Sequence, residues 1–569
     1  MPCNPRLGAL ALVLVACPQD PPLVEDPTAD DGATTTPGDV TTGPAPTTGS
    51  TVAVACDAVV CIDNMAIPCV DGVLGEPVAC LVDCLDGLGC RDCEPGAARC
   101  GDAGVERCDD AGAWIPGEPC IAAQGFTCDA DTLTCTGPCA PDALVDAGHH
   151  GCEFYAVPVA SLTYGDDVFG VRVHNPGDEP ATLTAEKPLW VGSVTEIPPH
   201  ATALVFLPWH PHLLNTLDVS TRAAAASVHL QSDRPVAVVQ LSPLIPGSST
   251  EASLLVPVRV WSTAYRVASA ASRDDYPGLY AVVAGADGVT VDLDPPAGVS
   301  VRPGDGVAAD GTGSIVLDRG DVLQVLAAPQ NDLTGTGITA DGPIAVIGGH
   351  MCAEVPPVVP SCDHIEESMP PVAQLGRRHA VVPPLRADGA GARAQYVRII
   401  ASENLTTLDY DPPQDLPAML VYAGDHIDID PDAAAFVIDA SAPVLVAQYM
   451  LGYGWDDLQG APALTIATPV ERFRRDHTLH ASPYWSWTDV DVVAPAGAAV
   501  TLDGEPLTDW SPIGGSDLAH AHVRLFPLGE PDHELAADVP IGAQVYGTAS
   551  QPHSTSYWHP AGHSFAPSR

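Results

Sequence analysis

The sequence predicts a mainly β protein, in which a disulfide-rich N-terminal stalk is followed by about four diverged β-sandwich-like repeats. Three observations predict this fold class. Fourteen of the 18 cysteines lie between residues 56 and 152. Short alternating strands recur after residue 152. The chain also carries 52 glycines and 58 prolines, which interrupt helices, while its 46% hydrophobic residues suffice for folded cores.

The charge balance excludes one class of partner. Twenty-three Lys and Arg residues stand against 72 Asp and Glu residues, a formal net charge of −49. Binding to a phosphate backbone requires clustered basic side chains, so no nucleic-acid partner is expected.

Residues 1–16 predict a lipoprotein signal peptide. Arg6 precedes a short apolar run, which is too short to span a bilayer. The run ends in Leu14-Val-Ala-Cys17, which resembles a bacterial lipobox. This resemblance implies export and a membrane contact through a lipid anchor at Cys17, at the outer membrane or cell surface of a bacterium. An ordinary secretory signal with a chance cysteine is the alternative.

Residues 17–55 predict a disordered tether. From Pro18 to Ala55, 21 of 38 residues are Thr, Pro, Gly or Ser, with six acids and no base. Such a segment lacks the apolar periodicity that would offset its ordering entropy.

Residues 56–152 predict a cysteine-rich region stapled by disulfides. The spacing Cys61-x7-Cys69-x10-Cys80 is echoed by Cys100-x7-Cys108-x11-Cys120, which indicates two related units. An exported chain with an even number of these cysteines favours disulfides over zinc, but the spacing leaves their connectivity open. The cysteines of this framework are Cys56, Cys61, Cys69, Cys80, Cys84, Cys90, Cys93, Cys100, Cys108, Cys120, Cys128, Cys135, Cys139 and Cys152.

Residues 153–569 predict a body of four β units, near 153–250, 251–375, 376–470 and 471–569. A proline followed by a β-rich run recurs at positions 235, 343, 443 and 540, at spacings of 108, 100 and 97 residues. Each proline is expected at the first residue of a strand, where a missing N–H costs least. The histidines near the C-terminus, including His559 and His563, are expected in polar turns.

Two segments of this body resemble a known family. They are Gly348-Gly-His-Met-Cys352 with its continuation through Cys362-Asp-His-Ile-Glu-Glu to Pro371, and Phe169-Gly-Val-Arg-Val-His-Asn-Pro-Gly-Asp178. Both are similar to the IgGFc-binding protein N-terminal domain family, and the resemblance covers roughly Glu153 to Pro560. It implies an extracellular binding or adhesive role, and the whole layout resembles bacterial surface lipoproteins that carry this domain. It transfers no residue-level Fc site.

The candidate sites are few. Cys352 and Cys362 predict a disulfide that pins a proline-rich loop. No metal is expected, although two groups of hard-oxygen and imidazole donors are weak candidates, with Ca²⁺ the cation considered. The alternative for both groups is solvated loop or strand edges. The candidates are His350, Asp363, His364 and Glu366 in one group, and Asp428 and Asp430 in the other.

No catalytic motif is present: the chain lacks a G-x-S-x-G elbow, an HExxH pair and a Walker A loop. The sequence therefore predicts a non-catalytic, lipid-anchored, extracytoplasmic surface protein for adhesion or for protein or glycan binding, without cofactor. Two alternatives remain open: an exported hydrolase without a local motif, and a structural component of the cell envelope.

Overall fold

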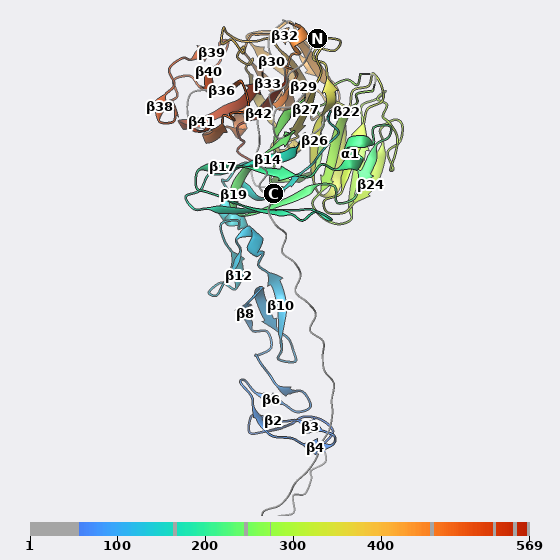
Figure 1. The fold of residues 1–569 in the computed structure, drawn as a ribbon, viewed down its shortest axis with the longest axis vertical. Coiled ribbons are helices and arrows are strands. Elements are labelled where there is room, and N and C mark those ends of the chain that lie inside the picture. Colours follow the sequence, from blue (N-terminus) through green and yellow to red (C-terminus); the bar gives the residue numbers. More distant parts are fainter. Residues whose placement is uncertain are drawn as a thin grey trace, which may run out of the picture.

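The computed structural model describes residues 56–162, 168–243, 249–273, 275–455, 460–526, 531–549 and 555–565. The predicted signal peptide, the lipid anchor at Cys17 and the tether lie outside these residues. The predicted fold class is confirmed: within the described ranges nearly all of the regular secondary structure is β-strand, and α1 (Pro211–Asn215) is their one α-helix. Figure 1 shows a slender arm, built by the cysteine-rich region, that leads into a broad β head.

The arm consists of two modules with the same disulfide connectivity. In each module the first cysteine bonds the third, the second bonds the fifth, and the fourth bonds the sixth. The bonds are Cys56–Cys69, Cys61–Cys84 and Cys80–Cys90 in the first module, and Cys93–Cys108, Cys100–Cys128 and Cys120–Cys135 in the second. The shared pattern accounts for the repeated cysteine spacing.

Small sheets of two or three strands complete both modules. Few of their side chains are buried, so the disulfides supply the stability that a larger core would give. The strands of the first module are β1 (Val60–Ile62), β2 (Met65–Ile67), β3 (Cys69–Val70), β4 (Val73–Leu74), β5 (Val78–Ala79), β6 (Cys84–Leu85) and β7 (Gly89–Cys90). Those of the second are β8 (Ala98–Gly101), β9 (Gly104–Cys108), β10 (Trp114–Pro119), β11 (Thr127–Asp129) and β12 (Thr134–Thr136).

The second module is fixed to the head. A seventh disulfide, Cys139–Cys152, joins its end to β13 (Gly151–Ala156), the first strand of the head. The short helix η1 (Ala122–Gln124) contacts the head, where buried Gln124 Nε2 lies 3.4 Å from Glu153 Oε2. The arm is therefore held by a covalent bond and by packing at the same junction.

The head contains four sheets of seven or eight strands, each organised around one long strand. The long strands are β19 (Val228–Ser242), β26 (Gly337–Ala353), β33 (Phe436–Met450) and β41 (Asp532–Thr548). We call the four sheets units 1 to 4. In each unit the first half of the long strand pairs with an entry strand and the second half pairs with an exit strand.

Each unit takes its strands largely from consecutive sequence. Unit 1 contains β13, β14 (Phe169–Asn175), β15 (Ala181–Glu186), β16 (Ser193–Ile197), β17 (Ala201–Leu207), β19 and β20 (Glu251–Leu254). Unit 2 contains β18 (Thr221–Ala223), β21 (Ser262–Arg266), β22 (Gly278–Ala284), β23 (Val289–Asp294), β24 (Gly313–Leu317), β25 (Val322–Leu326), β26 and β27 (Asp363–Ser368). Although β18 lies between strands of unit 1 in the sequence, it pairs with β25.

Unit 3 contains β28 (Gly376–Val381), β29 (Gln395–Ala401), β30 (Thr406–Asp411), β31 (Met419–Leu420), β32 (His426–Asp432), β33 and β34 (Leu464–Ile466). Unit 4 contains β35 (Arg474–His480), β36 (Trp487–Pro495), β37 (Val500–Leu502), β38 (Glu505–Pro506), β39 (Ser511–Pro512), β40 (Leu518–Phe526), β41 and β42 (Ser556–Pro560). In unit 1, side chains from both halves of the curled sheet share one apolar core, as Leu183 and Val171 illustrate.

The repeated prolines lie inside the long strands, so the prediction that they begin strands is wrong. Pro235 falls between Gln231 and Val236, the two positions at which pairing of β19 with β13 is interrupted by a bulge. Pro343, Pro443 and Pro540 occupy the same kind of gap in the other three long strands. Because none of the four prolines faces a paired residue on a neighbouring strand, the missing N–H costs little at these positions.

The four exit strands, β20, β27, β34 and β42, meet at the centre of the head. β20 contacts β27 and β42, and β34 contacts the same two strands, so the four strands close a ring. Figure 1 places β27 and β42 in this central position. Among the described residues, no helix is long and apolar enough to cross a membrane.

Candidate functional site

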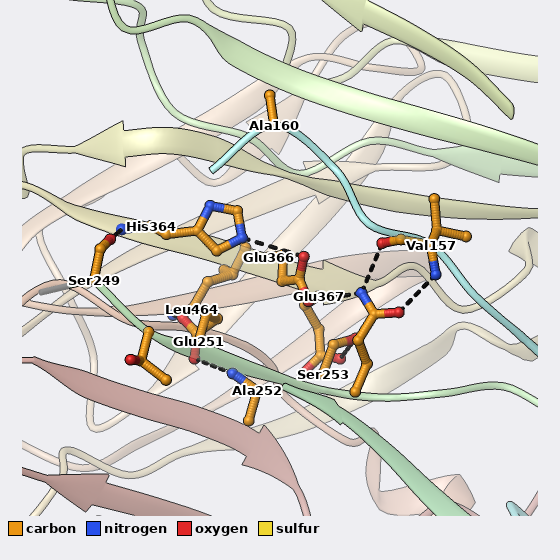
Figure 2. A network of polar contacts seen from close by, with 12 residues as sticks. Val157, Ala160, Ser249, Glu251, Ala252, Ser253, His364, Glu366, Glu367 and Leu464 are labelled. Atoms are coloured by element: carbon orange, nitrogen blue, oxygen red, sulfur yellow. Dashed lines mark hydrogen bonds and ion pairs between the residues drawn. The ribbon is translucent and has the colours of Figure 1, made fainter. Parts of the chain in front are cut away.

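The ring of exit strands brings acidic side chains into a fully buried position, which we call the central junction (Figure 2). Glu251 of unit 1 accepts hydrogen bonds from the backbone N–H groups of Ala252 at 3.0 Å, Leu464 at 2.7 Å and Trp558 at 2.9 Å. Leu464 and Trp558 belong to units 3 and 4. One carboxyl group therefore joins three units. Burial raises the pKa of Glu251 well above its ordinary value.

Asp363 of unit 2 has a similar role. Its Oδ1 accepts from the N–H of Thr250 at 3.1 Å, and its Oδ2 accepts from the hydroxyl of Thr555 at 2.6 Å. Burial raises the pKa of Asp363 to about 8, although hydrogen bonds to its oxygens oppose the shift. The group ties unit 2 to the ends of units 1 and 4.

The remaining junction acids also bind protein donors. Glu366 accepts from Gln240 Nε2 at 2.8 Å and contacts His364 Nε2 at 3.2 Å. Glu367 accepts from the Ser253 hydroxyl at 2.8 Å, and burial raises its pKa well above the ordinary value. Two atoms, His364 Nδ1 and Glu367 Oε2, are buried without a partner. The junction uses its acids to hold strands from different units together.

The candidates considered for a cation are thus divided between sites. Asp363, His364 and Glu366 meet at the junction. His350 is engaged separately, because its Nδ1 accepts from the Cys352 N–H at 2.9 Å and its Nε2 contacts the Ala271 carbonyl at 3.2 Å. Within the described ranges, no group of three or more His, Cys, Asp or Glu side chains is arranged to hold a metal ion.

Asp428 and Asp430 lie on the exposed face of β32. Asp428 forms a two-pronged ion pair with Arg398, at 2.6 Å and 2.9 Å. Arg398 also reaches Asp332 of unit 2 at 2.8 Å, so Asp428 contributes to the contact between units 2 and 3. The predicted disulfide between Cys352 and Cys362 is present in the structure.

A second polar region lies between units 1 and 4, and we call it the seam cavity. It has a volume of about 320 Å³, and nine of its eleven lining residues are titratable. Unit 1 contributes the end of β14 and the turn before β17, and unit 4 contributes β35, the turn after β37 and the start of β41. The lining residues are His150, His174, Pro176, His200, Asp476, His477, Thr478, Asp503, Asp532, His533 and Glu534.

Sequence reasoning missed the seam cavity because its walls come from positions more than 300 residues apart. The Thr202 hydroxyl, for example, donates to Asp532 across 330 positions at 2.6 Å. The prediction that the C-terminal histidines lie in polar turns is wrong for His559 and His563, while His553 lies outside the described residues. His559 is buried beside Arg172 and His563 beside Thr468, and burial lowers the pKa of each histidine to about 3.

An arm of disulfide modules that carries a helix-poor β head defines a protein of the extracellular type. Residues 251–547, more than half of the chain, match the family described as IgGFc binding protein. The chain therefore belongs to the IgGFc-binding protein family. The matched range covers most of unit 2, unit 3 and most of unit 4, and it is narrower than the range of the resemblance seen in the sequence.

A curated relative is the human "IgGFc-binding protein", which is 26% identical over 345 residues. That alignment covers 57% of this chain but only 6% of the human protein. Among solved structures, an anti-sigma factor domain-containing protein from Clostridium clariflavum aligns with 68% of this chain and 99% of its own, at 10% identity and a TM-score of 0.10. A TM-score this low bears on neither fold nor function.

Proposed function

We propose that the protein is a lipid-anchored, non-catalytic binding protein of the bacterial cell surface. In this proposal Cys17 carries the lipid, residues 17–55 form the tether, and the arm presents the head to protein or glycan ligands outside the cell. The observation that carries the proposal is the arm itself. Its two matched disulfide modules and the Cys139–Cys152 bond hold the head at the end of a covalently braced support.

Family membership supports the choice of a protein ligand. The human relative is named for binding the Fc portion of IgG, and this makes Fc a reasonable first probe for the present chain. The chemistry of the central junction supports a structural role for its acids, since each one accepts hydrogen bonds from other strands.

The anchor is tested by the intact mass of the protein purified from membranes, before and after reduction and alkylation. An acylated N-terminal Cys17 with 16 thiols that appear only on reduction supports the proposal. An unmodified Cys17 contradicts surface anchoring.

Binding is tested with the full mature chain on a biosensor, against Fc, Fab fragments as the matched control, and an array of extracellular proteins and glycans. Saturable binding that excess soluble chain competes away supports the proposal. A blank array with correctly folded protein favours a structural role in the envelope.

A further inference from the structure

The seam cavity has an excess of hydrogen-bond acceptors, which begins with its carboxylates. Four acids line it: Asp476, Asp503, Asp532 and Glu534. Although burial opposes ionisation, hydrogen bonds from His480 and Thr202 hold the pKa of Asp532 below its ordinary value. The Arg474 side chain acts against burial in the same way and lowers the pKa of Asp476.

Basic side chains near the cavity are already engaged by protein groups. Arg474 Nη2 pairs with Asp476 Oδ2 at 2.9 Å and its Nη1 donates to the Ala147 carbonyl at 3.1 Å. Arg172, two residues before His174 on β14, is buried and lies 3.0 Å from His559 Nε2. Four carboxyl groups thus face the cavity beside one paired guanidinium.

Histidines of the cavity wall use one ring nitrogen to bind protein acceptors. A carboxylate only accepts, so the 2.7 Å contact between His533 Nδ1 and Asp503 Oδ2 assigns the proton to Nδ1. The other ring nitrogen, His533 Nε2, is buried without a partner in a side chain about nine-tenths buried.

The proton of His174 is assigned in the same way, through the hydroxyl of Thr202. The Thr202 hydroxyl donates to Asp532, so it accepts from His174 Nδ1 at 3.1 Å. Burial lowers the pKa of His174 to about 4, so the ring is neutral at pH 7 and its Nε2 carries a lone pair at the cavity. His200 also lines the cavity, and its Nε2 donates to Asp178 at 2.9 Å.

The size of the cavity favours a large cation that donates hydrogen bonds over a metal ion. A metal ion needs its ligands within about 2.0–2.6 Å, and none of the described side chains form such a group. A volume of 320 Å³ is roughly that of ten water molecules, which suits a larger ion that donates several hydrogen bonds. A guanidinium presents five N–H donors in a plane.

We infer that the seam cavity binds a guanidinium group, as carried by an arginine side chain of the protein ligand. The inference deepens the proposed function and rests on it for the source of the arginine. The formal net charge of −49 adds long-range attraction for a basic partner.

The test is calorimetric titration of the full mature chain with three probes: the peptide acetyl-Gly-Arg-Gly-amide, its citrulline analogue, and methylguanidine. Citrulline keeps the shape and removes the charge. The arginine peptide is expected to bind and the citrulline peptide to bind at least about tenfold more weakly. Comparable binding of methylguanidine assigns recognition to the ion itself, whereas a preference for the peptide assigns it to a protein side chain.

Two variants locate the binding. Glu534→Gln and the double variant Glu534→Gln/Asp476→Asn are expected to weaken binding of the arginine peptide about fivefold or more, because they remove one and two charges from the cavity wall. Glu534 is exposed, so its replacement leaves folding intact. The matched control is Glu403→Gln, an exposed acid of unit 3, which is expected to bind like the wild type.

The inference is overturned if both peptides bind equally, if neither binds, or if the cavity variants match the wild type. It is also overturned if Zn²⁺ binds in a 1:1 ratio and displaces the peptide, since the cavity is then a metal site. The protein ligand found on the biosensor array separates the two proposals. If that ligand still binds the cavity variants with full affinity, only the cavity inference fails.

Discussion

The central junction and the seam cavity are built from the same residue types, yet the structure uses them differently. At the junction Glu251, Asp363 and Glu367 receive N–H and hydroxyl donors from neighbouring units, so the carboxyl groups are consumed as structural links. At the cavity His174 and His533 donate from Nδ1 to protein acceptors, and His533 Nε2 is buried without a partner. A polar cluster is therefore classified by its donors and acceptors together, and the identity of its residues alone is insufficient.

The comparison also predicts opposite pH responses. Acids with raised pKa values weaken the folded state as pH rises, whereas histidines with lowered pKa values weaken it as pH falls. Four experiments separate these contributions.

The largest effect is expected from acid. Burial lowers the pKa of His350 and His477 to about 4 and of His559 and His563 to about 3. The unfolded chain takes up these protons near pH 6.5, so the stability contributed by neutral, buried rings is present above that pH and is lost as pH falls toward 4. Each ring costs about 1.4 kcal/mol per pH unit in this window. We expect global unfolding before pH 4, measured by circular dichroism; a urea midpoint unchanged between pH 7 and pH 5 contradicts this.

The second largest effect is expected from Glu251→Ala. The substitution leaves the N–H groups of Ala252, Leu464 and Trp558 buried without their acceptor, at about 1–3 kcal/mol each. The urea midpoint at pH 7 is expected to fall sharply. The matched control Glu534→Ala, at an exposed cavity position, is expected to stay within about 0.5 kcal/mol of wild type. Equal losses in both variants contradict the distinction between the two regions.

A smaller effect is expected from Asp363→Asn. The folded pKa of Asp363 is about 8, so its contribution is fully present below the unfolded value near 4 and is lost progressively as pH rises to about 8. Between pH 6.5 and 8, the wild type is expected to lose stability, with a slope of up to about 1.4 kcal/mol per pH unit from Asp363. In urea titrations across this pH range, the unfolding free energy of the variant is expected to fall less steeply with pH than that of the wild type. An unchanged slope would mean that other groups cause the pH dependence.

The smallest effect on stability is expected at the cavity. Glu534→Gln removes an exposed charge that makes no side-chain contact required by the fold, so the unfolding free energy is expected to change by less than about 0.5 kcal/mol. Its effect appears in binding of the arginine peptide. A large loss of stability makes Glu534 part of the structural framework and removes the contrast with Glu251.

Local patterns predicted the arm and the strand content, because cysteine spacing and the alternation of apolar residues both depend on residues close together in the sequence. The repeated cysteine spacing predicted two related modules, and runs of alternating apolar and polar residues predicted the strands. Pro235 and the three equivalent prolines were predicted to begin strands. A sequence shows that proline lacks an N–H, but it does not show the bulge in which the missing hydrogen bond costs little.

By itself, the sequence determined a cysteine-stapled segment, a β-rich body in about four units, and a strongly acidic chain without clustered basic residues. Tertiary structure decided which cysteines bond, which acids become links, and where a cavity opens. The reason is distance along the chain. Two of the three donors to Glu251 lie 213 and 307 positions away, and the Thr202–Asp532 contact spans 330 positions. Only the closure of the four units brings such partners within hydrogen-bond range.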